Sequence, residues 1–226
     1  MFKLPFAALG LAALATAALA HGDVAPQPVN TDALPDVGEE WLTENPYRGQ
    51  EAEVWQAAID IGGSGYNQNC ARCHGLGGVS GGLAPDLRYL EAEEMGDEWF
   101  VERFRTGYTQ NGITKMPAFG ELLGQKAAWA IRTYLETRPD DGALDEATGR
   151  LLEIRDELTS LAGGGGGGDV AALKAELSKI AQGVETGSGA PVADSAPYRA
   201  ASLIGGAQPD FAGAAEALTV GLSAAH

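Results

Sequence analysis

The sequence predicts an all-α fold, and three observations lead to that prediction. Residues 125–137 carry an apolar stripe on one helical face, formed by Ala128, Ile131 and Leu135. Between residues 144 and 184, apolar side chains recur at alternating three- and four-residue steps on both sides of a glycine run. The motif Cys-Ala-Arg-Cys-His begins at Cys70, and its spacing places both thiols on one helical turn.

The first twenty residues are typical of a secretory signal peptide. Lys3 precedes an alanine-rich apolar run, and Ala18-Leu19-Ala20 offers a small-residue cleavage site. The run is short and polar residues follow it, so we expect no membrane span in the mature form. We therefore expect residues 1–20 to be cleaved on export to the periplasm, and residues 21–48 to form an N-terminal arm.

The segment Cys70-Ala71-Arg72-Cys73-His74 has the pattern for covalent attachment of a c-type haem. Its two thiols can add to the two vinyl groups of one haem, and the histidine is then delivered to the iron. A disulfide, a thioredoxin-like redox pair or half of a zinc site are the alternatives for the cysteines. Zinc lacks ligands, because the chain has two cysteines and its other histidines are His21 and His226. A thioredoxin-like site would want a βαβ context, whereas these surroundings are glycine-rich and helical.

Haem iron that serves electron transfer commonly takes methionine as its second axial ligand. Loss of the signal peptide leaves Met95, in an acidic and solvent-seeking run, and Met116. Pro117 biases Met116 toward an extended backbone, which suits a side chain that points inward from a loop. We therefore predict Met116 as the distal ligand, with Phe119 covering a haem edge; core filling is the alternative for either methionine.

Further positions fit a small haem pocket. Pro85 follows the motif closely enough for its carbonyl to accept the proximal ring N–H, although an ordinary turn proline is the alternative. Gly62, Tyr66 and Cys70 lie one turn apart and share a helix face. A glycine there lets a second helix cross closely, and residues 125–137 are the expected partner.

The charged residues have two expected roles. Asp97 is expected to cap a third helix that runs through Thr106. The net charge of −16 argues against nucleic acid and anionic membranes as partners, and leaves a basic docking partner open. Beside the acidic fringe of residues 91–98, three cations could serve in docking, with solvated surface as the alternative: Arg72, Arg88 and Lys115.

A resemblance to a known family runs through seven segments: Gly38–Leu42, Asn45–Gly49, Gly65–Cys70, Ser80–Leu87, Gly96–Phe100, Met116–Pro117 and Trp129–Arg132. Residues 34–138 resemble the monohaem class I cytochromes c, and more narrowly the periplasmic cytochromes c-550 of PQQ-dependent alcohol oxidation. The resemblance implies three to four helices around one covalent haem c in residues 49–138. It also implies the family's roles at matching positions: thioether bonds at Cys70 and Cys73, axial ligation at His74 and Met116, histidine orientation at Pro85, and helix crossing at Gly62 and Tyr66.

The function that this resemblance implies is that of an electron carrier and not an enzyme. The expected donor is a PQQ-dependent alcohol dehydrogenase, and the expected acceptor is a terminal oxidase or another cytochrome. Two alternatives stay open. One is a haem sensor or peroxidase-like enzyme with a displaceable distal ligand, and the other is an interaction protein whose haem serves structure.

A different pattern follows Arg138. Heptad-spaced apolar residues in residues 139–184 flank the run Gly163–Gly168, which predicts a helical hairpin with a glycine-rich loop. Pairing of these helices between two copies of the protein, or docking on the haem domain, are the alternatives. Residues 185–226 are rich in Gly, Ala, Ser and Pro, so we expect a loose tail with at most a weak helix from Phe211 to Ala224.

Overall fold

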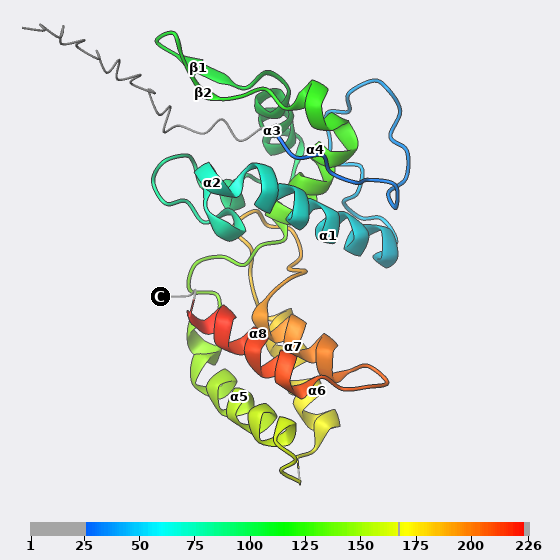
Figure 1. Ribbon diagram of the computed structural model, residues 1–226, viewed down its shortest axis with the longest axis vertical. Coiled ribbons are helices and arrows are strands. Elements are labelled where there is room, and N and C mark those ends of the chain that lie inside the picture. Colours follow the sequence, from blue (N-terminus) through cyan, green and yellow to red (C-terminus); the bar gives the residue numbers. More distant parts are fainter. Residues whose placement is uncertain (1–25, 167, 224–226) are drawn as a thin grey trace, which may run out of the picture.

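The computed structural model describes residues 26–166 and 168–223, so the predicted signal peptide lies outside the described residues. An N-terminal module and a C-terminal bundle are stacked along the long axis of the molecule (Figure 1). No helix among the described residues is both long and apolar enough to cross a membrane. The N-terminal module contains α1 (Ala52–Asn69), α2 (Ala71–His74), α3 (Glu94–Thr106), β1 (Tyr108–Gln110), β2 (Ile113–Met116) and α4 (Gly120–Glu136). The C-terminal bundle contains α5 (Thr148–Ala162), α6 (Val170–Gln182), α7 (Ala196–Ile204) and α8 (Phe211–Ser223).

The close crossing of α1 and α4 is confirmed. Gly62 lies directly against the backbone of Ala130, where a larger residue would not fit. Helix α4 begins at Gly120, before the predicted apolar stripe. Gly124 interrupts the helix after its first turn, because its φ of 76° lies in the left-handed region. The fully buried residues of α4 follow this break, whereas Leu123 before it is partly buried against the core.

The prediction that Asp97 caps α3 is wrong. The helix begins at Glu94, and Asp97 lies inside its first turn with its side chain fully buried. Its Oδ1 accepts hydrogen bonds from Arg48 and Arg132, both at 2.8 Å. One buried and one partly exposed guanidinium group stabilise the carboxylate there, whereas a capping aspartate would remain at the solvent-exposed helix end.

A short β-hairpin interrupts the otherwise helical N-terminal module. Strands β1 and β2 pair antiparallel, and Asn111 and Gly112 form the turn with φ values of 52° and 74°. Positive φ at both turn residues is the backbone of a type I′ hairpin, for which Asn-Gly is the preferred pair. The hairpin places Met116 at the end of β2 in an extended conformation, as Pro117 predicts.

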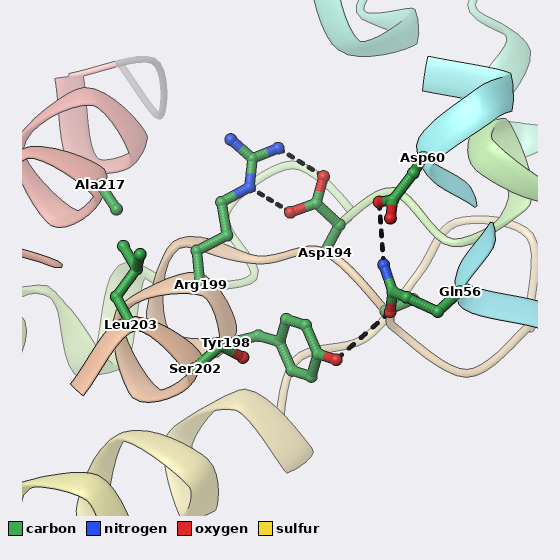
Figure 2. Close-up of a pocket in the computed structure, with 9 residues that line it drawn as sticks. Gln56, Asp60, Asp194, Tyr198, Arg199, Ser202, Leu203 and Ala217 are labelled. Carbon is green, nitrogen blue, oxygen red and sulfur yellow. Dashed lines mark hydrogen bonds and ion pairs between the residues drawn. The ribbon is translucent and has the colours of Figure 1, made fainter. Parts of the chain in front are cut away.

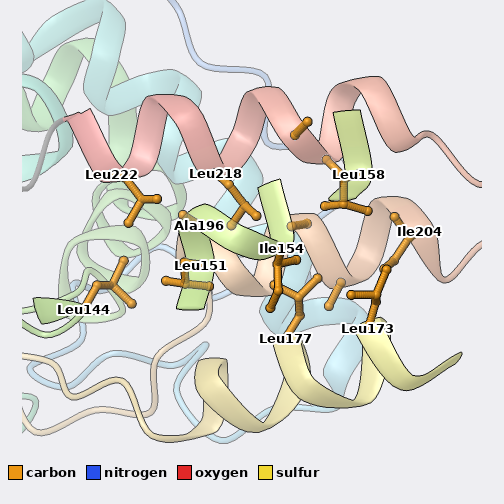
Figure 3. Close-up of a cluster of buried hydrophobic side chains, with 14 of the residues drawn as sticks. Leu144, Leu151, Ile154, Leu158, Leu173, Leu177, Ala196, Ile204, Leu218 and Leu222 are labelled. Atoms are coloured by element: carbon orange, nitrogen blue, oxygen red, sulfur yellow. The ribbon is translucent and has the colours of Figure 1, made fainter. Parts of the chain in front are cut away.

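The C-terminal bundle corrects the expectation of a loose tail. Helices α7 and α8 lie in that segment, and α8 coincides closely with the weak helix expected from Phe211. Their alanine faces let backbones approach closely, since a Cβ on Gly221 would lie 2.2 Å from the Cβ of Ala196. Figure 3 shows the shared core, which includes Leu151, Ile154, Leu158, Leu173, Leu177, Ile204, Leu218 and Leu222.

The expected hairpin is present in outline, because α5 and α6 flank the glycine run. Their closest packing partners are nevertheless different helices: α5 packs mainly against α8, and α6 mainly against α7. The heptad faces are covered within the chain, since Leu151, Leu158 and Leu177 are completely buried. The alternative in which these faces pair two copies of the protein would need them exposed, and here they are covered by α7 and α8.

Two segments tie the bundle to the N-terminal module: one precedes α5, and the other connects α6 to α7. Pro139 forms a bridge with Thr186, and the returning segment donates from the backbone of Ala193 to the carbonyl of Thr137 at 3.4 Å. A cleft of about 550 Å³ lies at this junction (Figure 2). Its polar side chains bind one another, in the pairs Arg199–Asp194, Tyr198–Gln56 and Gln56–Asp60. Among these pairs, Tyr198–Gln56 joins α7 to α1.

Candidate haem-binding site

The Cys-x-x-Cys-His motif lies where α1 turns into α2. The backbone N–H of Cys70 donates to Tyr66 at 2.8 Å, and that of His74 donates to Cys70 at 3.0 Å, so the motif forms a tight turn. Both cysteines are free thiols; Cys70 is partly buried and Cys73 is exposed. Burial, and secondarily Cys73, raises the pKa of the Cys70 thiol to about 12. Thioredoxin-like cysteines need a lowered pKa, so this environment disfavours that alternative.

The orientation of His74 is set by Pro85. The ring Nδ1 of His74 lies 3.0 Å from the carbonyl oxygen of Pro85. A carbonyl only accepts, so Nδ1 carries the proton and donates, which leaves Nε2 with its lone pair free for a metal. The structure thus brings together the two residues for which the sequence predicts this contact.

The loop after the histidine is held by Tyr66. Its hydroxyl donates to the carbonyl oxygen of Gly75 at 2.7 Å. Gly75 has φ of 82°, and a Cβ there would lie 1.9 Å from the carbonyl oxygen of Val79. Tyr66 is completely buried, and its ring centroid lies 5.5 Å from that of Tyr134 on α4. The tyrosine therefore joins the motif, the loop and the helix crossing.

Met116 and Phe119 meet the motif in one apolar cluster. Phe119 belongs to its buried core, and Met116 and Cys70 both pack against that core. The backbone N–H of Phe119 donates to Phe104 at 2.8 Å, which fixes the chain just after the hairpin. Gly107 permits the close approach of Met116, because a Cβ there would lie 2.4 Å from the Met116 carbonyl oxygen. Residues far apart in sequence thus line one apolar region.

Met95 lies apart from this region. Its side chain is 73% exposed on α3, as its acidic surroundings predict. Of the two methionines in the described residues, Met116 is therefore the one placed with the motif.

The donor set fits a c-type haem. It combines two unpaired thiols on one turn, an imidazole with a free Nε2 and a thioether beside one apolar cluster. Among the described residues, no group of three or more His, Cys, Asp or Glu side chains could hold a metal ion by itself. A zinc site built on these cysteines lacks the further ligands that it needs.

The docking cations predicted from the sequence divide into two kinds. Arg72 and Lys115 are exposed, as that role requires. Arg88 is 3% exposed and pairs with Asp86 and Asp141, so its prediction as a docking cation is wrong. Asp141 lies more than fifty residues after Arg88, beyond the segment that resembles the cytochromes, so local sequence does not reveal this pairing.

Sequence reasoning also missed the hairpin that carries Met116. Its signal was present, because Asn111-Gly112 is the strongest short-range hairpin pattern. The clamp of Asp97 between Arg48 and Arg132 was missed as well, and no local pattern distinguishes it from an ordinary acidic helix start.

The fold and this donor set define a cytochrome c-type domain, and comparison with known proteins agrees. Residues 57–135 match the family model described as cytochrome c oxidase, cbb3-type, subunit III. Cytochrome c550 of Pseudomonas aeruginosa is 52% identical over 124 residues, which cover 55% of this chain and 85% of that protein. The chain belongs to the cytochrome c550 family. It is therefore an electron-carrier cytochrome, and its cofactor is haem c.

Two quinohemoprotein alcohol dehydrogenases of Pseudomonas putida also match. ADH-IIG is 34% identical over 85 residues, and ADH IIB is 32% identical over 82 residues. The matches cover 38% and 35% of this chain, but only 11% of either dehydrogenase. No solved structure matches.

Proposed function

We propose that residues 49–138 form a cytochrome domain that holds one haem c and shuttles single electrons. The proposed site residues are Cys70 and Cys73 for the thioether bonds, His74 and Met116 as axial ligands, Pro85 to orient the histidine, and Tyr66 and Phe119 as pocket walls. The observation that carries this proposal is the fixed His74 ring, whose Nδ1 is held by Pro85 while Nε2 stays available. The shared apolar cluster of Cys70 and Met116 supports it.

When bound, the haem supplies an iron that takes up and gives back one electron. His74 and Met116 would hold this iron through their imidazole and thioether groups, and together they would leave no coordination site for a substrate or for dioxygen. The apolar cluster excludes water from the iron's surroundings and thereby favours electron transfer over ligand chemistry. This distinguishes a carrier from a sensor or a peroxidase-like enzyme, whose distal position must open.

The proposed electron donor is a PQQ-dependent alcohol dehydrogenase. The support is that two quinohemoprotein alcohol dehydrogenases contain a segment similar to this chain. A separate carrier of the same type can take electrons from a dehydrogenase that lacks such a segment. A terminal oxidase or another cytochrome is the proposed acceptor. The proposed location is the periplasm, reached through cleavage of residues 1–20.

The donor is tested by mixing the oxidised holoprotein with purified quinoprotein alcohol dehydrogenases and their alcohols under anaerobic conditions. We expect rapid appearance of the reduced haem spectrum with one of them, and none when the alcohol is omitted. Slow reduction by every dehydrogenase would overturn the proposed donor, while the electron-carrier family would stand.

Axial ligation is tested with Met116→Leu and the matched control Met95→Leu. We expect the first variant to lose the far-red methionine–iron charge-transfer band and to bind carbon monoxide, because a distal position opens. The control variant should keep the band, since Met95 is exposed on α3. A wild-type protein that is high-spin and binds carbon monoxide readily would favour the sensor or peroxidase-like alternative instead.

A further inference from the structure

The loop that supplies the Pro85 carbonyl is fastened to the segment that leads into the C-terminal bundle. The fastener is Arg88, which lies in a 3₁₀ turn three residues after Pro85 and is 3% exposed. Its guanidinium Nη2 lies 2.7 Å from Oδ2 of Asp86 and 2.8 Å from Oδ1 of Asp141, and its Nη1 donates to the carbonyl of Pro139 at 3.2 Å. One side chain thus joins two segments that are far apart in sequence.

The same arginine braces the loop from within. Its Nε and its backbone N–H both donate to Oδ1 of Asp86, at 3.1 and 3.0 Å. Asp86 also accepts from the backbone of Ser80 at 3.2 Å, and the Ser80 hydroxyl donates to Ala84 at 2.5 Å. The aliphatic stem of Arg88 lies over Gly78, where a Cβ would come within 3.0 Å of it. The residues on both sides of Pro85 are therefore held in place.

Charge pairing within this group is strong. Burial by itself would raise the pKa of Asp86, but hydrogen bonds from the side chain and backbone of Arg88 outweigh it and lower the pKa overall. An arginine suits the position because its planar fork can serve both carboxylates and a carbonyl at once, which a lysine ammonium on a flexible stem does less well.

The bundle side of this contact is itself anchored. The hydroxyl of Tyr89 donates to Asp140 at 2.8 Å, and the ring of Tyr89 packs against Gly187. The backbone N–H of Ala92 donates to the carbonyl oxygen of Ser188 at 2.9 Å, and the Ser188 hydroxyl donates to the backbone carbonyl of Glu136 at 2.5 Å. The segment that connects α6 to α7 thus contacts the residues that follow Arg88.

We propose that Arg88 is a positioning residue through which the C-terminal region tunes the haem. By tying Asp86 to Pro139 and Asp141, it holds the Pro85 carbonyl at hydrogen-bond distance from His74. The inference rests on the proposed function, because it takes His74 as the proximal ligand. A carbonyl held firmly on Nδ1–H makes the imidazole a stronger electron donor, which stabilises ferric iron and lowers the reduction potential.

The test compares Arg88→Lys with wild type in the full-length holoprotein. Lysine keeps the charge but loses the fork, so direct charge effects on the haem change little. We expect the reduction potential to rise, and the His74 ring N–H in the ferrous state to exchange with solvent about tenfold faster by NMR, because the Pro85 contact opens more often.

Two further variants keep the test decisive. Arg138→Lys is the matched control, because Arg138 also fastens the bundle, through Asp194 at 2.5 Å, but does not touch the loop. It should move neither readout. Asp141→Asn should move both in the same direction as Arg88→Lys but less, and it is safe for folding because the Asp141 side chain is 71% exposed.

The inference would be overturned if Arg88→Lys and Asp141→Asn lost thermal stability but kept the wild-type reduction potential and the wild-type exchange rate of the His74 ring N–H. That result would show a merely structural role for Arg88. An equal change in Arg138→Lys would overturn it too. Failure of the proposed function is a different outcome: the wild-type protein itself would then lack the far-red methionine–iron band and the protected His74 ring N–H.

Discussion

Gly62 of α1 and Ala130 of α4 are in direct backbone contact, since a Cβ on residue 62 would lie 1.9 Å from the Ala130 carbonyl oxygen. The neighbour is helix backbone and cannot swing away. We expect Gly62→Ala to lower the free energy of unfolding by about 1–3 kcal/mol or more, because the helices must separate. Urea unfolding measures this. The control is Gly149→Ala in α5, which meets no atom within 4 Å and should be neutral or slightly stabilising.

The hydrogen bond from the Tyr66 hydroxyl to Gly75 can be removed by a single substitution. Tyr66→Phe removes the donor to Gly75 and leaves that carbonyl unsatisfied. We expect a loss of about 1 kcal/mol in unfolding free energy, with the haem still attached. Thermal unfolding of the holoprotein measures it. Tyr198→Phe, which breaks a 3.3 Å hydrogen bond of a 38% exposed side chain, should cost less. Equal losses in the two variants would contradict the assigned role of Tyr66.

Asp97 and Glu136 are two buried carboxylates of the N-terminal module, and both pair with Arg48 and Arg132. Asp97→Asn leaves Glu136 as the remaining carboxylate of this group, at 2.7 Å from Arg48 and 3.8 Å from Arg132. We expect a loss of about 3 kcal/mol in unfolding free energy, because the buried Arg132 loses its 2.8 Å partner and keeps only the longer pair with Glu136. The surface pair Arg150–Glu176 provides the comparison, and Glu176→Gln should cost less than about 1 kcal/mol. A loss that small for Asp97→Asn would mean that water reaches the cluster.

The joint between the modules is expected to weaken in acid. Burial by itself would raise the pKa of Asp194, but Arg199 and Arg138 outweigh it and hold the pKa below its ordinary value. The stabilisation from Asp194 is therefore complete above the unfolded-state pKa of about 4 and is lost as pH falls through the lower folded-state value.

This pH dependence is measured as the difference in melting temperature between wild type and Asp194→Asn. The difference should be constant from pH 7 to about pH 5 and should shrink below pH 4. Asp156→Asn is the control, because the Asp156 side chain is 70% exposed, and it should give little difference at any pH. A wild-type advantage that persists unchanged to pH 2 would contradict the assignment.

Helices α7 and α8, in the segment for which a loose tail was expected, should contribute to the stability of the C-terminal bundle. Leu218→Ala in α8 empties a completely buried site, and we expect a loss of about 2–5 kcal/mol in unfolding of the C-terminal bundle. Leu203→Ala, at a side chain that is 36% exposed, should cost clearly less. Protease digestion that removes residues 185–223 from wild type as fast as an unfolded peptide would contradict a folded bundle.

Much of the candidate site can be predicted from the sequence. The spacing from Cys70 to His74 places three groups on one turn, and Pro117 sets the backbone of Met116; both are properties of neighbouring residues. Pro85 is near enough in sequence for its contact with His74 to be expected, and the structure has it at 3.0 Å. The Gly62 crossing could be expected as well, because it follows from helical period alone.

The amino-acid order by itself thus determines the short-range features: the turn of the Cys-x-x-Cys-His motif, the extended backbone of Met116 and the helix-crossing glycine. It does not determine where Arg88 and Asp97 lie, because an ionised side chain is buried only where distant partners, here Asp141 and Arg48, compensate it. The same holds for α7 and α8, whose alanine faces become stable only against the leucines of α5 and α6, and a short helix without such a surface would not persist in water.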